Sequence, residues 1–230
     1  MTETLERLAE CKLQAEIDKL DAERDFHVAN ARVADTLREQ EEIALRVRLR
    51  AEKDILARND HHNVYVFDHD VDEESVKLCI QTITGWARNS GPDGPCDIEI
   101  QLNTSGGSIF AGFALIDFLR DLRRNGHKVT AVVLGHAASM GAVMLQAADV
   151  RIMGANAFLL LHEGSMFSGG DFGRLEDDMK LYSKLHGRIL ALLSERATID
   201  VKTIKAGWKR TDWWLTSDEA LVRGFIDEVR

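Results

Sequence analysis

The sequence predicts an α/β protein, a parallel sheet with covering helices, preceded by a separate helical arm. From Asn63 onward, short apolar segments typical of strands alternate with amphipathic segments typical of helices. Such alternation implies parallel strands joined by crossover helices. The first part of the chain is different, because no glycine occurs before Gly85 and no proline before Pro92, and these are the residues that interrupt helices.

Residues 1–58 form the predicted arm. They are rich in Glu, Arg, Ala and Leu, and acidic and basic residues alternate along them, which indicates one long solvated helix or two. Leu13, Ile17 and Leu20 fall at helical spacing, but this apolar stripe is thin and drifts after Leu20. A solvated arm is the simpler interpretation, and a coiled coil or a partner-binding helix is the alternative.

The segment "NDHHN" (59–63) ends the helical pattern, and we expect a second domain over residues 63–230. The pattern there predicts a first strand, an amphipathic helix with acidic residues in its first turn, and a loop at "GPDGP". Further strands and helices alternate after the loop. In chain order, the expected elements are strand 63–68, helix 72–90, loop 91–95, strand 96–103, helix 109–124, strand 128–135, a helix from Ser139, strands 149–154 and 157–164, the glycine-rich stretch 164–173 and a helix over 174–198.

Composition excludes several classes of protein. The formal charge of −9 argues against a nucleic-acid binder, which must neutralise phosphates. No apolar stretch approaches the roughly 18 residues of a membrane span, and the charged N-terminus lacks the apolar segment of a secretory signal. Cys11, Cys79 and Cys96 form no CxxC pair. We therefore expect a cytoplasmic protein without metal or other cofactor, and without nucleic-acid or membrane partners.

Two glycine-containing segments are candidates for a catalytic site. In "LNTSGGSIFAG", Gly106 and Gly107 stand between a strand and a helix, where backbone N–H groups can converge on an oxyanion; an ordinary tight turn is the alternative. In "GHAASMG", Ser139 begins a helix among small residues that leave its hydroxyl accessible. Taken alone, Ser139 is either a nucleophile or a helix cap.

His162 and Asp212 could complete a nucleophilic site. His162 ends the apolar run "AFLLLH" and is either a core histidine or the base that takes the serine proton. Asp212 precedes two tryptophans, Trp213 and Trp214, which we expect to be partly buried, so that its carboxylate could orient the imidazole; a surface acid is the alternative. Each of these residues follows a predicted strand or lies in a loop: the glycine pair, the serine, the histidine and the aspartate. Ligand and catalytic sites of parallel α/β sheets are formed at such positions.

These segments resemble the proteolytic subunit of the Clp protease. "LNTSGGSIFAG", "GHAASMGAVMLQAA", "LLLHEG" and "TDWWLTSDEALVRGFIDEV" are similar to its signature segments in order and spacing, and the likeness runs from about Asn63 to Arg230. The resemblance implies a serine endopeptidase with Ser139 as nucleophile, His162 as base and Asp212 as orienting acid. It also implies oxyanion-hole amides from Gly107 and Met140.

The resemblance further implies a crotonase-like α/β fold with a protruding strand–helix handle, here "GSMFSGGDFG" and the helix after it. In the family the handle brings two rings face to face around a closed chamber, so we expect protein or peptide substrates and a homo-oligomeric ring. The family usually has Pro in place of Ser105, Gln in place of His136, and Gln-Pro in place of "EG" at 163–164. We expect His136 to pack between subunits or to be solvated.

Both ends of the chain depart from the family. The arm replaces a short axial loop, and the tail beyond "GFIDEV" is absent. The family meets its ATP-driven unfoldase at these ends, so that partner stays open. Three other functions remain as alternatives: a viral prohead-maturation protease that cleaves scaffold protein, a crotonase-type acyl-CoA hydratase or isomerase, and an inactive structural ring subunit.

Overall fold

The computed structural model describes residues 2–90, 94–165 and 169–230, and the chain divides into two units, 1–58 and 59–230. The first unit is the helix α1 (Thr2–Leu56), whose 55 residues confirm the predicted helical arm as one helix and not two. All of its described side chains are exposed. Within the described residues, no helix combines the length and the apolar character needed to cross a membrane.

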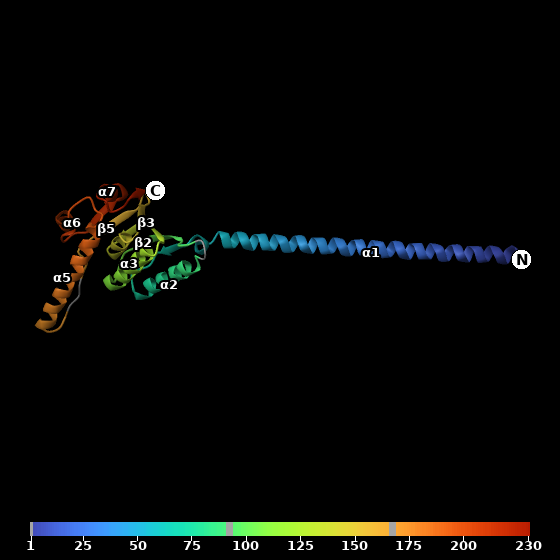
Figure 1. Cartoon of the computed structure of the whole chain (residues 1–230), viewed down its shortest axis with the longest axis horizontal. Coiled ribbons are helices and arrows are strands. Elements are labelled where there is room, and N and C mark those ends of the chain that lie inside the picture. Colours follow the sequence, from blue (N-terminus) through green and yellow to red (C-terminus); the bar gives the residue numbers. More distant parts are fainter. Residues whose placement is uncertain (1, 91–93, 166–168) are drawn as a thin grey trace. The chain divides into compact units, whose positions relative to one another are not determined.

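The second unit is an α/β fold around a mostly parallel sheet (Figure 1), which confirms the predicted fold class. It opens with the short 3₁₀ helix η1 (Asn59–His62), where the helical pattern of the arm ends. Five described strands lie side by side in the order β1-β2-β3-β4-β7, and every pairing among them is parallel. Their bounds are β1 (Val64–Phe67), β2 (Asp97–Thr104), β3 (Lys128–Ala138), β4 (Val150–Met153) and β7 (Glu228–Val229).

The strand β3 changes its partner along its length. Residues 130–133 pair with β4, whereas residues 136–138 pair with β5 (Phe158–Leu161), which in turn pairs antiparallel with β6 (Trp213–Thr216). The predicted strand stopped at Gly135, since glycine usually marks a turn. Here Gly135 takes a φ of 86° inside the strand, and β3 continues to the residue before Ser139.

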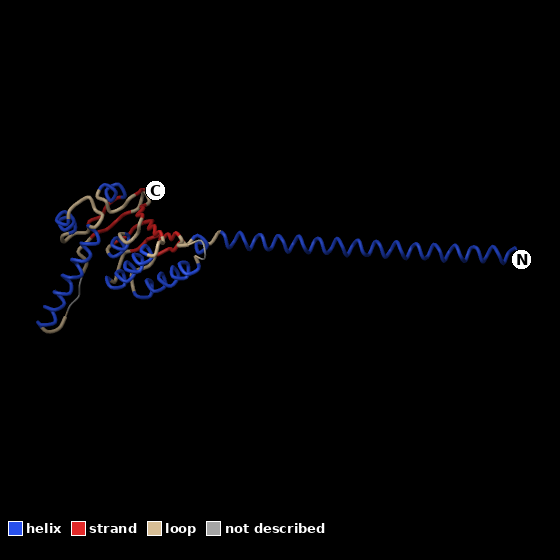
Figure 2. The backbone as a smooth tube through the Cα atoms, in the orientation of Figure 1, coloured by secondary structure: helices blue, strands red, loops and turns tan. Residues whose placement is uncertain are grey.

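Six helices accompany the sheet within the described residues. Figure 2 shows helices packed around the strands. Helices α2 and α3 match the predicted segments, and Asp72 begins α2 with a capping box to Ser75. The short α6 and the strands β6 and β7 were not predicted, and residues 91–93 of the expected loop lie outside the described residues. The bounds are α2 (Glu73–Asn89), α3 (Ile109–Arg124), α4 (Met140–Leu145), α5 (Phe172–Ser194), α6 (Val201–Trp208) and α7 (Ser217–Val222).

The core of this unit lies between the sheet and its helices. Helix α3 buries one face through residues at helical spacing, among them Leu115 and Leu119, and α4 is buried along its whole length. Truncating a buried leucine of this kind to alanine costs about 2–5 kcal/mol of folding free energy. The segments next to Ser139 are therefore held on both sides by packed apolar side chains.

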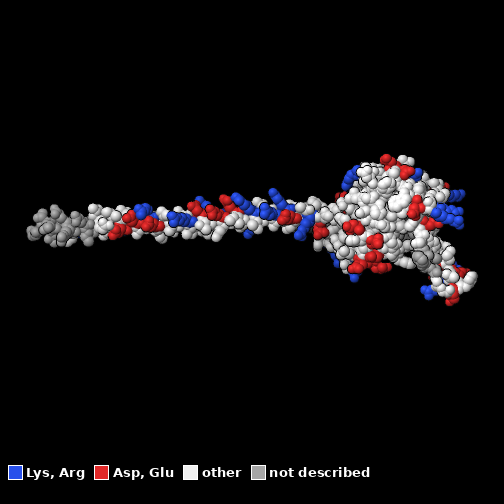
Figure 3. All heavy atoms as spheres, turned by 180° about the vertical axis from the view of Figure 1, so that it is seen from behind, with Lys and Arg blue, Asp and Glu red and all other residues white. Residues whose placement is uncertain are grey.

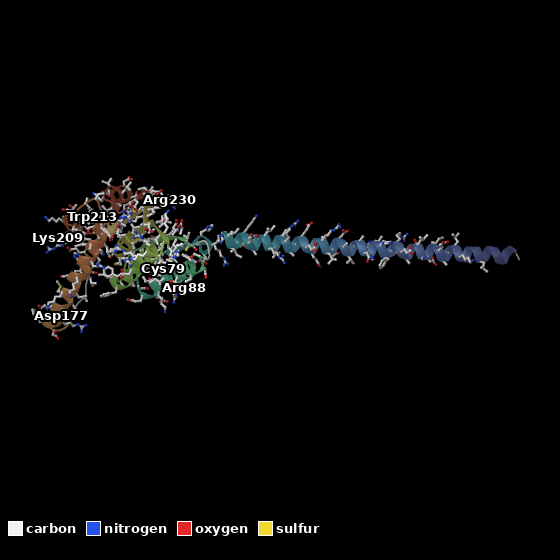
Figure 4. All side chains as sticks on the ribbon, in the orientation of Figure 1. Cys79, Arg88, Asp177, Lys209, Trp213 and Arg230 are labelled. Atoms are coloured by element: carbon white, nitrogen blue, oxygen red, sulfur yellow. The ribbon has the colours of Figure 1, made fainter. Side chains whose placement is uncertain are left out.

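Helix α5 extends away from the sheet (Figure 1), and Asp177 lies toward its outer end (Figure 4). Only Leu190, Leu192 and Leu193, near its C-terminus, are buried. Toward the outer end, Phe172 is 82% exposed and Met179 is 55% exposed. This helix corresponds to the predicted handle, whereas residues 166–168 of the glycine-rich stretch lie outside the described residues.

Candidate active site

Ser139 stands in a strained backbone conformation between β3 and α4. Its φ is 53° and its ψ is −119°, a region that residues with a side chain rarely adopt and that costs about 1–3 kcal/mol. The side chain makes no capping hydrogen bond to α4, so Ser139 does not act as an ordinary side-chain cap. Its backbone N–H donates to the carbonyl of Leu160 on β5 at 3.0 Å, and this bond fixes the turn against the sheet.

The structure brings the three predicted residues together. Ser139 Oγ lies 2.7 Å from His162 Nε2, and His162 Nδ1 lies 3.4 Å from Asp212 Oδ1. The reason is the pairing of the strands: β3 ends beside β5, and the antiparallel register of β5 with β6 sets Leu161 opposite Trp213. His162 follows the one strand and Asp212 precedes the other, so the pairing leaves them side by side.

The surroundings of Asp212 differ from the prediction. Its side chain is 62% exposed. Trp213 is half-buried against Phe225, as expected, but the expectation is wrong for Trp214, which is 48% exposed. Alternate residues of a strand face opposite sides, and in β6 the inward side is taken by Trp213 and Leu215. Water therefore reaches this carboxylate and screens its charge.

Gly106 approaches Ser139, and Gly107 approaches Val71, more closely than any side chain would allow. A Cβ added to Gly106 would lie 2.7 Å from Ser139 Cβ and 2.9 Å from Met140 N. A Cβ added to Gly107 would lie 2.3 Å from the carbonyl oxygen of Val71. Their φ values of 93° and 147° also favour glycine. The turn formed by the glycine pair is thus packed directly on the serine through Gly106.

Gly107 and Met140 border the same pocket as Ser139 and His162. Met140 is the first residue of α4, so its N–H has no acceptor within the helix. The pocket has a volume of about 190 Å³. Its apolar walls come from β5, α3, α4, α5 and α6: Ile109, Val143, Leu161, Ile189, Leu193 and Trp208. Glu163, Gly164 and Ser165, which follow His162, also line it.

His136, the other histidine near the serine, has a different partner. Its Nε2 lies 3.3 Å from Ser105 Oγ, at the exposed end of β2 and β3. Among the described residues that line the pocket of Ser139, His136 is absent and His162 is present. Among the residues that the structure describes, there are thus two hydrogen-bonded serine–histidine pairs, and of these the pair of Ser139 and His162 opens onto a pocket with a glycine turn.

Sequence reasoning did not identify an aromatic group behind His162. The Tyr182 hydroxyl of α5 donates to the carbonyl of Glu163 at 2.6 Å, the Tyr182 ring stacks on His186, and His186 contacts Trp208. Burial lowers the pKa of His186, so its imidazole is neutral near pH 7. No motif marks these residues, because their role depends on how α5 and α6 pack. They hold the segment that follows His162.

Known proteins share this arrangement of segments. The family model described as Clp protease matches residues 50–230, which is most of the chain. The chain belongs to the Clp protease family. Curated proteins named "ATP-dependent Clp protease proteolytic subunit" from Streptococcus equi subspecies equi and subspecies zooepidemicus are each 34% identical to it over 143 residues, covering 60% of this chain and 70% of theirs. One from Streptococcus pyogenes serotype M5 is 33% identical over the same length.

The family settles the class of the enzyme. The chain is a serine-type endopeptidase of the Clp proteolytic-subunit type. This outcome favours the first interpretation of the sequence over an acyl-CoA hydratase or isomerase and over an inactive ring subunit.

Proposed function

We propose that this enzyme cleaves peptide bonds with a triad of Ser139, His162 and Asp212. The observation that carries the proposal is the 2.7 Å separation of Ser139 Oγ and His162 Nε2, in a serine whose backbone is strained beside a pocket. A hydroxyl within hydrogen-bond distance of a neutral imidazole can lose its proton as it attacks a carbonyl carbon. Asp212 holds the Nδ1–H tautomer that leaves Nε2 free to accept that proton.

The reaction proceeds through an acyl-enzyme. Ser139 Oγ attacks the scissile carbonyl, His162 takes the proton, and the oxyanion that forms accepts hydrogen bonds from the Gly107 and Met140 N–H groups. His162 then protonates the leaving amine, and the peptide bond breaks. In the second half of the reaction His162 takes a proton from a water molecule, and the water oxygen attacks the carbonyl carbon of the ester. His162 then returns the proton to Ser139 Oγ, the ester bond breaks, and the product leaves as a carboxylic acid. The apolar walls of the pocket favour an apolar side chain next to the cleaved bond.

The second serine–histidine pair supplies the matched control for the test. Ser139→Ala should lower kcat/KM on a fluorogenic peptide by about 10⁴ or more, because triad residues act as a unit. Ser105→Ala likewise removes a serine hydroxyl, here from the pair with His136, and kcat/KM should stay within about twofold of the parent value. If Ser105→Ala abolishes hydrolysis and Ser139→Ala does not, the assignment of the nucleophile is wrong.

We also propose that the catalytic chain assembles into rings that stack through the handle and enclose a chamber for protein substrates. Supporting this, Phe172, Leu175 and Met179 of α5 are exposed apolar residues at helical spacing, and such patches mark interaction surfaces. Native mass spectrometry should show the mass of two stacked rings, and Met179→Glu should reduce it to the mass of one ring. An unchanged mass in the variant would contradict stacking through α5.

The division of the chain is part of the same proposal. Residues 1–58 serve as an accessory arm, and residues 63–230 are the catalytic domain, since every proposed catalytic residue lies in the second part. A chain without residues 1–58 should stay folded and keep its hydrolysis of short peptides. Loss of that activity would place the arm within the catalytic domain. Whether an ATP-driven unfoldase feeds the chamber is tested by comparing hydrolysis of a folded and an unfolded protein substrate.

A further inference from the structure

Helix α1 carries an apolar stripe that extends nearly its whole length, on a different face from Leu13, Ile17 and Leu20. Residues three and four positions apart share one face of an α-helix. The stripe, which we call the arm stripe, has three polar members, Lys12, Lys19 and Gln40. Its apolar members are Leu8, Ala15, Ala22, Phe26, Ala29, Val33, Leu37, Ala44, Val47, Ala51 and Ile55.

The arm stripe is uncovered in the single chain. Phe26 is 64% exposed and Val47 is 63% exposed, and Val33, Leu37 and Ile55 are also exposed. An apolar stripe with this spacing is the surface by which helices pack against one another. In proteins, most of the stability of a helix comes from the packing of such a face against another element. We therefore expect the arm stripe to pack against another helix.

The charges of α1 indicate which helix that is. Residues 16–25 contain five acidic and two basic side chains, whereas residues 46–53 contain four basic and one acidic. Figure 3 shows Lys and Arg side chains gathered toward the C-terminal part of α1. The helix macrodipole does not account for this separation, because its effect falls off within the first and last turns. An acidic and a basic segment on one helix complement each other in two antiparallel copies.

We propose that α1 binds the α1 of a second copy as an antiparallel pair, with a two-fold axis at Asp35. This register places the acidic segment of each copy beside the basic segment of the other. A parallel pair would set like charges together at both places, which is destabilising. In the antiparallel register Ala15 meets Ile55 and Phe26 meets Ala44, so a larger side chain faces a smaller one in each pair. At the centre of the seam Val33 meets Leu37.

Charged residues on and beside the arm stripe agree with the same register. Glu23 falls next to Arg48 of the other copy, and Lys19 falls next to Glu52. Each contact occurs twice, because a two-fold axis makes the interface isologous.

Disulfide trapping in the full-length chain tests the pairing. In a Cys11→Ala background, chains with Ala15→Cys are mixed with chains carrying Ile55→Cys, and interchain disulfides are measured after mild oxidation. The antiparallel register brings these two Cα atoms to the roughly 4.4–6.8 Å that a disulfide needs. The mixture should cross-link, and neither variant should cross-link with itself. Within one chain the two positions are about 60 Å apart, so only an interchain bond can form.

The opposite face of α1 provides the control. Ile17→Cys mixed with Ile55→Cys should not cross-link, since Ile17 lies on the other side of the helix. Glu23→Arg should weaken the trapping severalfold, and adding Arg48→Glu should restore it. Cross-linking of Ala15→Cys with itself would show a parallel pair, and the absence of any cross-link would show an unpaired arm; either result overturns the proposal. Peptide hydrolysis, measured in parallel, reports on the triad independently of the arm.

Discussion

Asp212→Asn is a sensitive test of the proposed triad, because the structure allows the expected loss of activity to be calculated. The variant keeps the shape of the side chain but removes the charge that faces the imidazolium formed in the transition state. At the observed 3.4 Å, the attraction between the two charges is about 1 kcal/mol at the dielectric constant of water and about 5 kcal/mol at an effective value of 20. Since Asp212 is 62% exposed, the true value lies between these limits.

The expected loss in kcat/KM therefore lies between about 5-fold and about 5,000-fold, since 1.36 kcal/mol corresponds to a factor of ten. It is smaller than the roughly 10⁴-fold loss of a triad with a buried aspartate. A fluorogenic peptide assay at 0.05 M and 0.5 M salt measures it, and the difference from the parent enzyme should shrink at high salt. Asp218→Asn, in the first turn of α7, is the control and should change the rate less than twofold. A loss below threefold for Asp212→Asn would refute its role.

Two other predictions follow from close packing and from a buried ion pair. Gly106→Ala should abolish both hydrolysis and labelling by a serine-directed probe, because the added methyl group would collide with Ser139. Gly85→Ala is the control, since its added Cβ has open space, and it should keep full activity. Equal activity of the two variants would contradict the close contact between Gly106 and Ser139. Asp227→Asn should lower the free energy of unfolding in urea by about 3–5 kcal/mol, because it leaves the guanidinium of Arg151, which is 2% exposed, without its carboxylate partner; a loss under 1 kcal/mol would contradict this. Burial alone would raise the pKa of Asp227, but the hydrogen bonds from Arg151 outweigh burial and lower the pKa. The stabilisation by this ion pair is therefore fully present at a pH above the ordinary aspartate pKa of about 4, and it is lost as the pH falls through the lowered pKa of the folded state. Urea unfolding between pH 3 and 7 should show that decline in the parent and a flatter profile in the variant.

Much of the fold could be predicted from the sequence, because local patterns decide most of its elements. Helix α3 has the predicted bounds, since Ser108 caps its start and apolar residues recur at helical spacing. Helix α6 was missed because its eight residues are too few for a clear periodicity. Strand β3 was ended too early at Gly135, because its last residues are strands only through their pairing with β5, which lies far along the chain.

The candidate site shows the same division between local and distant information. The small residues around Ser139 and the glycine pair are local signals, and both were recognised. The strain at Ser139 and the close approach of Gly106 depend on the path of β3, which the sequence does not state. The exposure of Asp212 was missed because the two tryptophans after it face opposite sides of β6, and only Trp213 is turned inward.

The arm carries a second apolar pattern besides the one on which the sequence analysis relied. The sequence drew attention to Leu13, Ile17 and Leu20, a stripe that fades. The longer arm stripe contains several alanines, which attract little notice in a hydrophobic count, and it becomes clear only when α1 is one continuous helix over 55 residues.

The central claim is that Ser139 is the nucleophile and His162 its base. Mass spectrometry of the full-length chain after reaction with a fluorophosphonate, followed by proteolytic mapping of the adduct, tests it most directly. We expect one adduct per chain on the peptide that contains Ser139, and its loss in His162→Ala. An adduct on Ser105, or labelling that persists at the same rate in His162→Ala, would contradict the account.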